Sequence, residues 1–170
     1  EVVSNNFSNL VAPNTCYGIY SSGGNNDTTF IDSNIVSNIS TTSTLSGTLY
    51  GIYNLNSTRC YVRDNLVNSL SGNSVTGIVF NYSSNKPNTE VYRNKIYGLN
   101  STTTSTNSLV ASGIYVYDYD EPGSIKLYNN LIGLITAPTS SGLNAVNGIR
   151  TSSFSLSDKL KLLIILINCN

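Results

Sequence analysis

The sequence contains no histidine, three cysteines and few charged residues. Zinc sites are built largely from histidine and cysteine, so the missing histidine argues against a zinc centre. Nine basic residues balance nine acidic ones, which argues against binding to nucleic acid or to an anionic membrane surface. The longest apolar run, Leu162 to Ile167, has six residues. A membrane helix needs about twenty, so no membrane insertion is expected.

What the sequence does contain is a repeat built around asparagine. Apolar residues stand three before, two after and five after one Asn in each unit; around Asn94 they are Val91, Ile96 and Leu99. The other asparagines of the set are Asn5, Asn34, Asn65 and Asn130, with apolar residues at Val2, Phe7, Leu10, Ile31, Val36, Ile39, Val62, Val67, Leu70, Leu127, Ile132 and Ile135. Since only 39% of the chain is apolar, this agreement indicates an internal repeat.

A second marker, Gly-Ile, alternates with the asparagines. It occurs at Gly18-Ile19, Gly51-Ile52, Gly77-Ile78, Gly113-Ile114 and Gly148-Ile149. The spacings between successive asparagines are 29, 31, 29 and 36 residues, and the differences arise between the markers. Insertions therefore fall in loops, as expected of a solenoid with one supersecondary unit per repeat.

The spacing inside each unit predicts strands. Thr89 and Val91 are two apart, and Ile96 follows Asn94 on the other side, which describes period-2 strands broken by a tight bend. No unit has the i, i+3, i+4, i+7 pattern of a helix. Asn suits the bend because it tolerates the left-handed conformation. Stacked about 4.8 Å apart, the five side chains are expected to hydrogen bond as a ladder.

In these features the chain resembles the parallel β-helix repeat of the pectate-lyase-like superfamily. The resemblance covers Glu1 to about Thr151. It implies an all-β, right-handed parallel β-helix of about five coils, with three short strands per coil and an inward Asn ladder at one corner. The strands would precede each Asn, follow it, and contain the Gly-Ile pair. That fold hosts lyases, glycoside hydrolases, phage tailspikes and adhesins, so it implies architecture rather than activity.

We expect one β-helix domain over residues 1–170. The chain begins within a strand, as a cut through a longer array would, so further coils or domains of the same parent chain are expected partners. Residues 152–170 are atypical and allow two interpretations. In the favoured one they open a truncated sixth coil, with Asn168 as the next corner and Ile165 three residues before it. In the other, Ser157-Asp158 caps a short helix that covers the stack.

The three cysteines are Cys16, Cys60 and Cys169, an odd number without metal-site spacing. Cys60 stands at an inward strand position, five residues before Asn65, which favours a small buried apolar role over a reactive thiol. Low cysteine content, with Ser, Thr and Asn making up 40% of the chain, is compatible with a bacterial protein that is secreted or attached to the cell surface. We expect an extracellular location.

Tyrosines give the first candidate site. Tyr20, Tyr53 and Tyr115 follow Gly-Ile pairs at outward positions, and Tyr117 stands beside Tyr115. Sugars bind flat aromatic faces, and the tyrosine hydroxyl adds a hydrogen-bonding group. A glycan-binding face is the functional interpretation. The structural one is that aromatic residues pair well on neighbouring strands without any ligand.

The densest acidic cluster is Asp118, Asp120 and Glu121. Such carboxylates on a loop suit calcium, and the resemblance to β-helix lyases implies a calcium site with a basic residue that abstracts a proton. The same residues also form an ordinary turn with Pro122-Gly123. No basic motif of those lyases aligns, and the histidine of the polygalacturonase-like relatives is missing. Arg93 flanks the central Asn at an outward, solvated position.

The sequence favours a non-catalytic, secreted or cell-surface repeat module with a structural or adhesive role and a face for polysaccharide or cell-surface glycan. No catalytic residue is assigned, and no cofactor is required, with calcium as the metal to test. The alternative is a fragment of a polysaccharide-active β-helix enzyme, lyase-like and calcium-assisted, with the acidic cluster as its metal site. Ice binding is weaker because the threonines sit in irregular loops.

Overall fold

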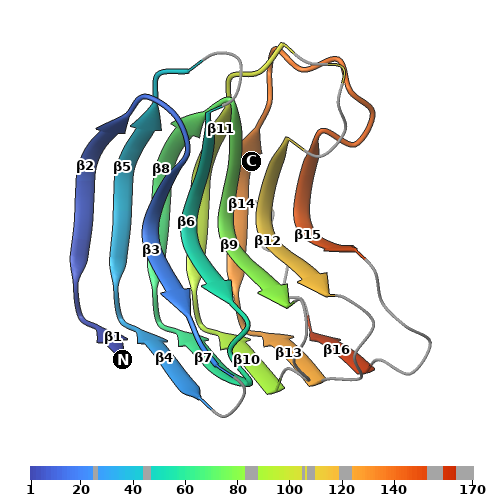
Figure 1. Ribbon diagram of the computed structural model, residues 1–170. Coiled ribbons are helices and arrows are strands. Elements are labelled where there is room, and N and C mark those ends of the chain that lie inside the picture. Colours follow the sequence, from blue (N-terminus) through green and yellow to red (C-terminus); the bar gives the residue numbers. More distant parts are fainter. Residues whose placement is uncertain are drawn as a thin grey trace.

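In the computed structural model the chain winds as a stack of coils (Figure 1). The structure describes residues 1–24, 27–43, 47–82, 88–104, 106, 110–118, 124–152 and 159–163. Each coil contributes one strand to each of three sheets, and every strand pairs in parallel with the equivalent strand one coil later. Within these ranges no helix could span a membrane.

The three sheets run along the stack. Sheet A contains β1 (Val2–Val3), β4 (Thr28–Asp32), β7 (Arg59–Arg63), β10 (Asn88–Tyr92), β13 (Ser124–Tyr128) and β16 (Lys159–Leu163). Sheet B contains β2 (Asn6–Ala12), β5 (Ile35–Thr41), β8 (Leu66–Gly72), β11 (Lys95–Ser101) and β14 (Leu131–Thr136). Sheet C contains β3 (Cys16–Ser22), β6 (Thr48–Leu55), β9 (Ser74–Tyr82), β12 (Ala111–Asp118) and β15 (Val146–Ser152). This topology confirms the predicted all-β parallel β-helix with three strands per coil.

The core lies inside the coil and consists of the repeated apolar residues. In the central coils these side chains are at most 1% exposed; they are Ile31, Val36, Ile39, Val62, Val67, Leu70, Val91, Ile96 and Leu99. The register stacks equivalent residues directly, for example Ile31 on Val62 and Val62 on Val91. Burying each Leu, Ile or Val contributes roughly 1.5–3 kcal/mol, so the stacked aliphatic columns are the main source of stability.

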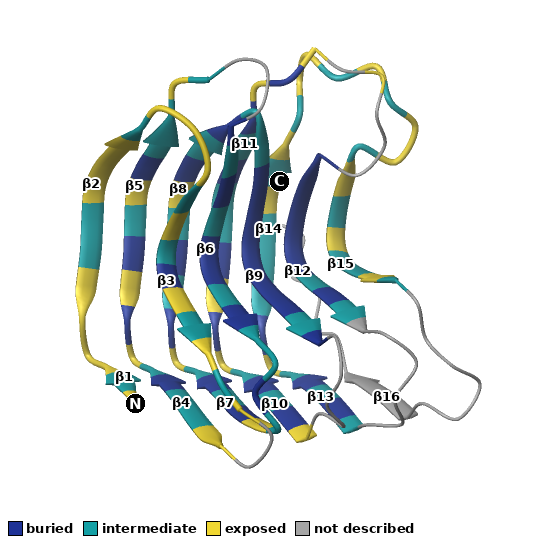
Figure 2. Cartoon of the chain, in the orientation of Figure 1, coloured by how far each residue is buried: buried dark blue, intermediate teal, exposed yellow. Residues whose placement is uncertain are grey.

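The coils at the two ends are less covered (Figure 2). Val2, Phe7, Ile132 and Ile135 are only partly buried, although they pack against the core. Leu10, predicted as a core residue, is 42% exposed. It lies in the first coil and has a neighbouring coil on one side only, which explains the difference.

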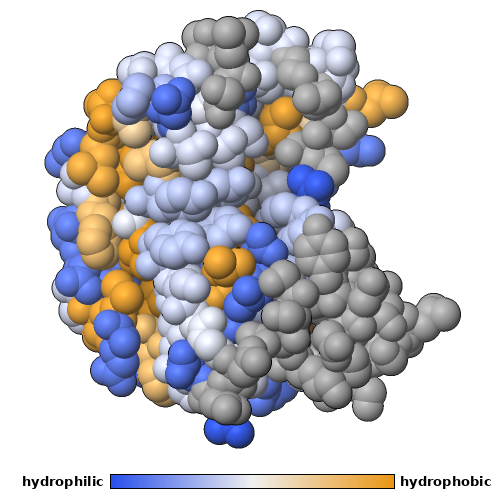
Figure 3. Space-filling model, in the orientation of Figure 1, coloured by the Kyte–Doolittle hydropathy of each residue, from blue (hydrophilic) through white to orange (hydrophobic). Residues whose placement is uncertain are grey.

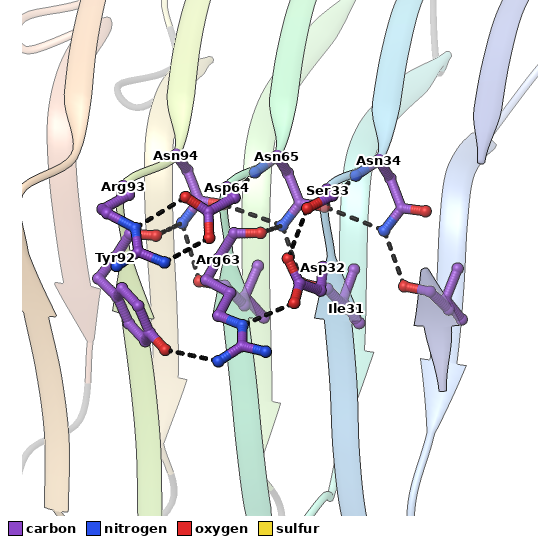
Figure 4. A network of polar contacts seen from close by, with 12 residues as sticks. Ile31, Asp32, Ser33, Asn34, Arg63, Asp64, Asn65, Tyr92, Arg93 and Asn94 are labelled. Atoms are coloured by element: carbon purple, nitrogen blue, oxygen red, sulfur yellow. Dashed lines mark hydrogen bonds and ion pairs between the residues drawn. The ribbon is translucent and has the colours of Figure 1, made fainter. Parts of the chain in front are cut away.

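The five repeat asparagines form one column of hydrogen bonds at the corner between sheets A and B. Figure 4 shows three of them, Asn34, Asn65 and Asn94. The Nδ2 of each of the first four asparagines donates to the Oδ1 one coil further on; from Asn34 to Asn65 the distance is 3.0 Å. Each Nδ2 after the first also donates to a strand carbonyl of the preceding coil, as from Asn65 to Ile31 at 2.9 Å. The side chains thus satisfy backbone groups that the bend removes from the sheets. We call this set the asparagine column.

The left-handed conformation at this corner belongs to the residue before each asparagine. Ser33 has φ 56°, Asp64 has φ 55° and Arg93 has φ 56°, whereas no asparagine of the column has positive φ. Our expectation that the asparagine itself adopts this conformation was therefore wrong. The physical reason is that the asparagine side chain must point inward to reach the next coil, and the preceding residue makes the turn.

A column of glycines bends each strand of sheet C. A Cβ atom on Gly51 would lie 2.5 Å from the carbonyl oxygen of Gly77, and one on Gly77 would lie 2.6 Å from that of Gly113. The same position faces core side chains at Gly18, Gly51, Gly77 and Gly113, such as Val67 beside Gly51. Glycine and the following isoleucine therefore both face inward, as at Gly51 and Ile52, which are both buried. The residues on either side of the pair face outward.

The tail continues sheet A. Strand β16 pairs with β13 and places Leu162 opposite Leu127, so residues 159–163 form a strand of this sheet. A corner at Asn168 would have placed Ile165 opposite Leu127, so the register differs from that expectation by three residues. Ser157, Asp158 and Asn168 lie outside the described residues.

Candidate ligand-binding face

The outward face of sheet C carries most of the candidate site. Because Gly18 and Gly51 bend their strands, tyrosines both before and after each Gly-Ile pair reach this face. Tyr17 lies opposite Tyr50, and Tyr20 lies opposite Tyr53. Pale side chains of intermediate hydropathy cover the middle of this surface (Figure 3).

Four of these tyrosines contact one another and form what we call the tyrosine quartet: Tyr17, Tyr20, Tyr50 and Tyr53. The Tyr17 and Tyr50 rings stack at 5.2 Å with an interplanar angle of 17°, and the Tyr20 and Tyr53 rings stack at 5.6 Å and 10°. The other contacts are edge to face, between 5.1 and 5.3 Å. Both arrangements are favourable for aromatic rings, so the quartet holds its own conformation before any ligand arrives.

A second aromatic group stands two coils further on. The Tyr115 and Tyr117 rings meet edge to face at 5.8 Å. The guanidinium of Arg150 lies 4.2 Å from the centre of the Tyr115 ring, within the range of a cation–π interaction. The Tyr115 hydroxyl and the Ser152 hydroxyl are 3.0 Å apart. These contacts fix the position of the Tyr115 ring.

A hollow of about 190 Å³ separates the quartet from this second group. It is lined by Tyr50, Tyr53, Val79, Asn81, Tyr115 and Tyr117. In the register Tyr53, Val79 and Tyr115 are successive residues of one column. Val79 is only 3% exposed. The hollow therefore exists because the coil between two tyrosine-bearing coils has valine at this position.

The pKa of Tyr50 is raised to about 12, first by burial and then by the neighbouring Tyr17, Tyr53 and Tyr115. The pKa of Tyr17 is also raised, first by burial and then by Tyr53 and Tyr20. These hydroxyls stay protonated at neutral pH. They offer a ligand neutral groups that both donate and accept hydrogen bonds.

The four tyrosines named from the sequence all lie on this face. Tyr53, Tyr115 and Tyr117 line the hollow, and Tyr20 backs Tyr53 from the quartet. Tyr50, Tyr17 and Asn81 were missed. Tyr17 and Tyr50 could have been found from the repeated motif Tyr-Gly-Ile-Tyr, which begins at each of these two residues. A straight strand would place tyrosines three apart on opposite faces, and only the bend at glycine brings them together.

The predicted acidic site falls largely outside the described residues. Asp118 ends β12, whereas Asp120 and Glu121 lie beyond what the structure describes. In the rest of the described chain no group of three or more Asp, Glu, Cys or His side chains could hold a metal ion. The calcium site stays a prediction.

The charged side chains on the outside of sheet A pair between coils (Figure 4). Arg63 binds Asp32 at 2.7 Å, and Arg93 binds Asp64 through two hydrogen bonds of 2.8 and 2.6 Å. The bond to Arg93 holds the pKa of Asp64 below its usual value. Arg93 was expected to be solvated; its guanidinium is exposed but ion-paired.

A third pair lies one coil further along. Lys126 binds Glu90 at 2.7 Å, and the Tyr128 hydroxyl donates to the other oxygen of Glu90 at 3.0 Å. The bond to Lys126 is the main reason that the pKa of Glu90 is lowered. The lowered pKa values keep Asp64 and Glu90 ionised at neutral pH, and all three ion pairs join one coil to the next.

Comparison with known proteins adds no relative: no family model, no curated protein and no solved structure matches the chain. The fold itself defines the class, a parallel β-helix solenoid.

Proposed function

We propose that this chain is a non-catalytic β-helix module of a secreted or cell-surface protein, structural or adhesive in role, which binds polysaccharide or cell-surface glycan on the outward face of sheet C. The observation that carries the proposal is the pair of aromatic groups on either side of the hollow at Val79. We also propose a right-handed coil related to the pectate-lyase-like superfamily. The asparagine column at one corner supports that relationship.

The physical support comes from what sugars require. The C–H faces of a pyranose are apolar and pack on aromatic rings, while its hydroxyls need donors and acceptors at the ring edge. The quartet offers exposed ring area, with Tyr20 52% exposed and Tyr17 39% exposed. Because stacking already orders these rings, binding loses little side-chain entropy.

We propose a non-catalytic role because the carboxylates on sheet A and its corner are held in ion pairs. Asp32, Asp64 and Glu90 are each held by a basic partner. Lowered pKa values, as at Asp64 and Glu90, suit permanent ion pairs. A general acid or base needs a pKa close to the working pH.

Affinity electrophoresis against a panel of soluble polysaccharides, followed by calorimetry with the best binder, tests this function. Tyr20→Ala should weaken binding about 2- to 10-fold, from roughly 0.5–1.5 kcal/mol per aromatic contact. Tyr97→Ala is the matched control, since Tyr97 stands on sheet B and hydrogen bonds Asn68; it should leave binding unchanged. Equal loss in both variants, or no binding by the wild type, would refute the proposal.

The enzyme alternative has its own assay. The protein is incubated with uronate polymers with and without calcium, and unsaturated products are followed by absorbance. We expect no product. Calcium-dependent product formation would replace the present proposal with a lyase, and Asp118→Asn together with Glu121→Gln would then be expected to abolish it.

A further inference from the structure

The hollow at Val79 interrupts an otherwise bulky column. Along sheet C the outward residues at this position are Tyr20, Tyr53, Val79, Tyr115 and Arg150. Where two tyrosines follow each other, as at Tyr20 and Tyr53, their rings stack and leave no space. At Val79 one ring is missing. The hollow therefore lies where one ring of the column is absent, with the buried Val79 beneath it.

Both walls of the gap are fixed from behind. Tyr53 is backed by Tyr20, with the two rings nearly parallel at 10°. Tyr115 is backed by Arg150, whose guanidinium lies 4.2 Å from the ring centre. Asn81 donates from Nδ2 to the Tyr53 hydroxyl at 2.7 Å, which holds the wall at its outer end. A ligand that enters meets a preformed site.

The width of the gap selects the kind of ring. Strands of adjacent coils are about 4.8 Å apart, so the strands that carry Tyr53 and Tyr115, two coils apart, are separated by about 9.6 Å. A flat aromatic ring held on both faces at carbon–carbon contact needs only about 7–8 Å. The remaining space of roughly 2 Å suits a puckered ring with hydrogens on both faces.

The residues that line the hollow also determine which ligand charge it accepts. None of the six lining residues is charged, and their polar groups are the Asn81 amide and the tyrosine hydroxyls. Arg150 lies on Tyr115 but does not line the hollow. A carboxylate carried into this gap would lose water without gaining a cation there. The gap therefore complements a neutral ligand that carries several hydroxyls.

We propose that the hollow binds one neutral pyranose residue of a glycan, inserted edge-on between the Tyr53 and Tyr115 rings, and that Val79 determines this specificity by leaving the space. This inference rests on the proposed glycan-binding function but differs from it in geometry. A sugar that lay flat across the tyrosines would use them as a platform and would have no need of the gap.

Val79→Tyr separates the two geometries. It places a ring in the gap with the same stacking as between Tyr20 and Tyr53, so it blocks insertion and enlarges a platform. The probes are cellohexaose, xylohexaose and mannohexaose, with tri-galacturonate as the anionic probe and a proline-rich peptide as the competing occupant of an aromatic gap. Val79→Thr, of the same shape, is the control. Binding is measured by calorimetry, and folding by circular dichroism.

We expect at least 10-fold weaker binding of a neutral hexasaccharide by Val79→Tyr and less than 3-fold change by Val79→Thr. Unchanged or tighter binding by Val79→Tyr would overturn insertion while leaving the glycan-binding function in place. Binding of tri-galacturonate alone, or of the peptide alone, would also overturn it. Failure of the wild type to bind any sugar would overturn the proposed function and the insertion together.

A second measurement avoids the need for Val79→Tyr to fold. Saturation-transfer NMR of the wild-type protein with the bound hexasaccharide reports which sugar protons lie against protein. Insertion predicts strong transfer to protons on both faces of one pyranose residue. Transfer to one face only, spread over several residues, would show a platform and contradict the inserted geometry.

Discussion

The oxygen Oδ1 of Asn94 accepts two hydrogen bonds from Asn65, one from its side-chain Nδ2 at 2.9 Å and one from its backbone N–H at 3.1 Å. Asn65 in turn accepts the same two bonds from Asn34. Both asparagines are at most 1% exposed. Since water cannot replace these partners, each inner member of the asparagine column is required by its neighbours on both sides.

Asn65→Ala should lower the free energy of unfolding by about 3–5 kcal/mol, because it leaves the Asn34 N–H and the Ile31 carbonyl without their buried partners. Urea denaturation followed by circular dichroism measures the change. Asn6→Ala, at an exposed position of β2, should stay within about 0.5 kcal/mol of wild type. Similar values for both variants would show that the asparagine column contributes little.

Gly51→Ala should be among the most damaging single substitutions in the chain. Its Cβ would stand 2.5 Å from the Gly77 carbonyl oxygen and 2.6 Å from Cγ1 of Val67, so the coils must separate to admit it, at a cost of roughly 3 kcal/mol or more. Gly148→Ala is the matched control in the same column, where a Cβ would meet nothing within 4 Å. It should be neutral or slightly stabilising. The comparison of melting temperatures checks both.

Leu134 offers a stabilising substitution. It has φ 50° and is 68% exposed, so it bears the steric cost of the left-handed region without burying its side chain. The equivalent residue one coil earlier is Gly98, with φ 65°. Leu134→Gly should raise the free energy of unfolding by about 0.5–1 kcal/mol. The reverse change, Gly98→Leu, should lower it by about 1–2 kcal/mol; a gain from the latter would contradict this explanation.

Because the thiol of Cys60 is buried, we expect the protein to lose stability at alkaline pH. Burial raises the pKa of this thiol to about 12 from an ordinary value of 9.0. Between these values the unfolded chain releases the proton and the folded chain keeps it, so the stability that is present below pH 9 declines as pH rises toward 12. The slope is at most about 1.4 kcal/mol per pH unit. Cys60→Val should remove this part of the slope in melting curves between pH 8 and 10.5, leaving the part that the tyrosines contribute to both proteins.

Much of the fold could be predicted because in-register stacking brings equivalent residues of successive units into direct contact. Ile31, Val62 and Val91 recur at one offset from asparagine, and the same three stack in sheet A. The apolar positions that recur in the repeat are therefore the residues that contact one another in the core. The exception, Leu10, fails only because a terminal coil has one neighbour.

The parts that could not be predicted depend on backbone conformation. The left-handed residue at the corner is Ser33, Asp64 or Arg93 in different coils, and this mixture of side chains gives no sequence signal. The contact of Tyr17 with Tyr20 depends on a bend that alternation along a straight strand does not foresee. The residue after each Gly-Ile pair places Val79 between Tyr53 and Tyr115 in the sequence, but the hollow itself depends on the positions of the tyrosine rings.

The asparagine column also gives the molecule a direction. Each amide from Asn5 to Asn94 donates to the side-chain oxygen of the next asparagine along the stack, and none donates to the side-chain oxygen of the asparagine before it, so these side-chain bonds all run in one direction. A whole unit can thus be duplicated or removed between two existing units with all bonds remade, whereas an inverted unit cannot be inserted. Growth of such a protein by tandem duplication lengthens it in equal steps of about 4.8 Å and leaves its cross-section unchanged.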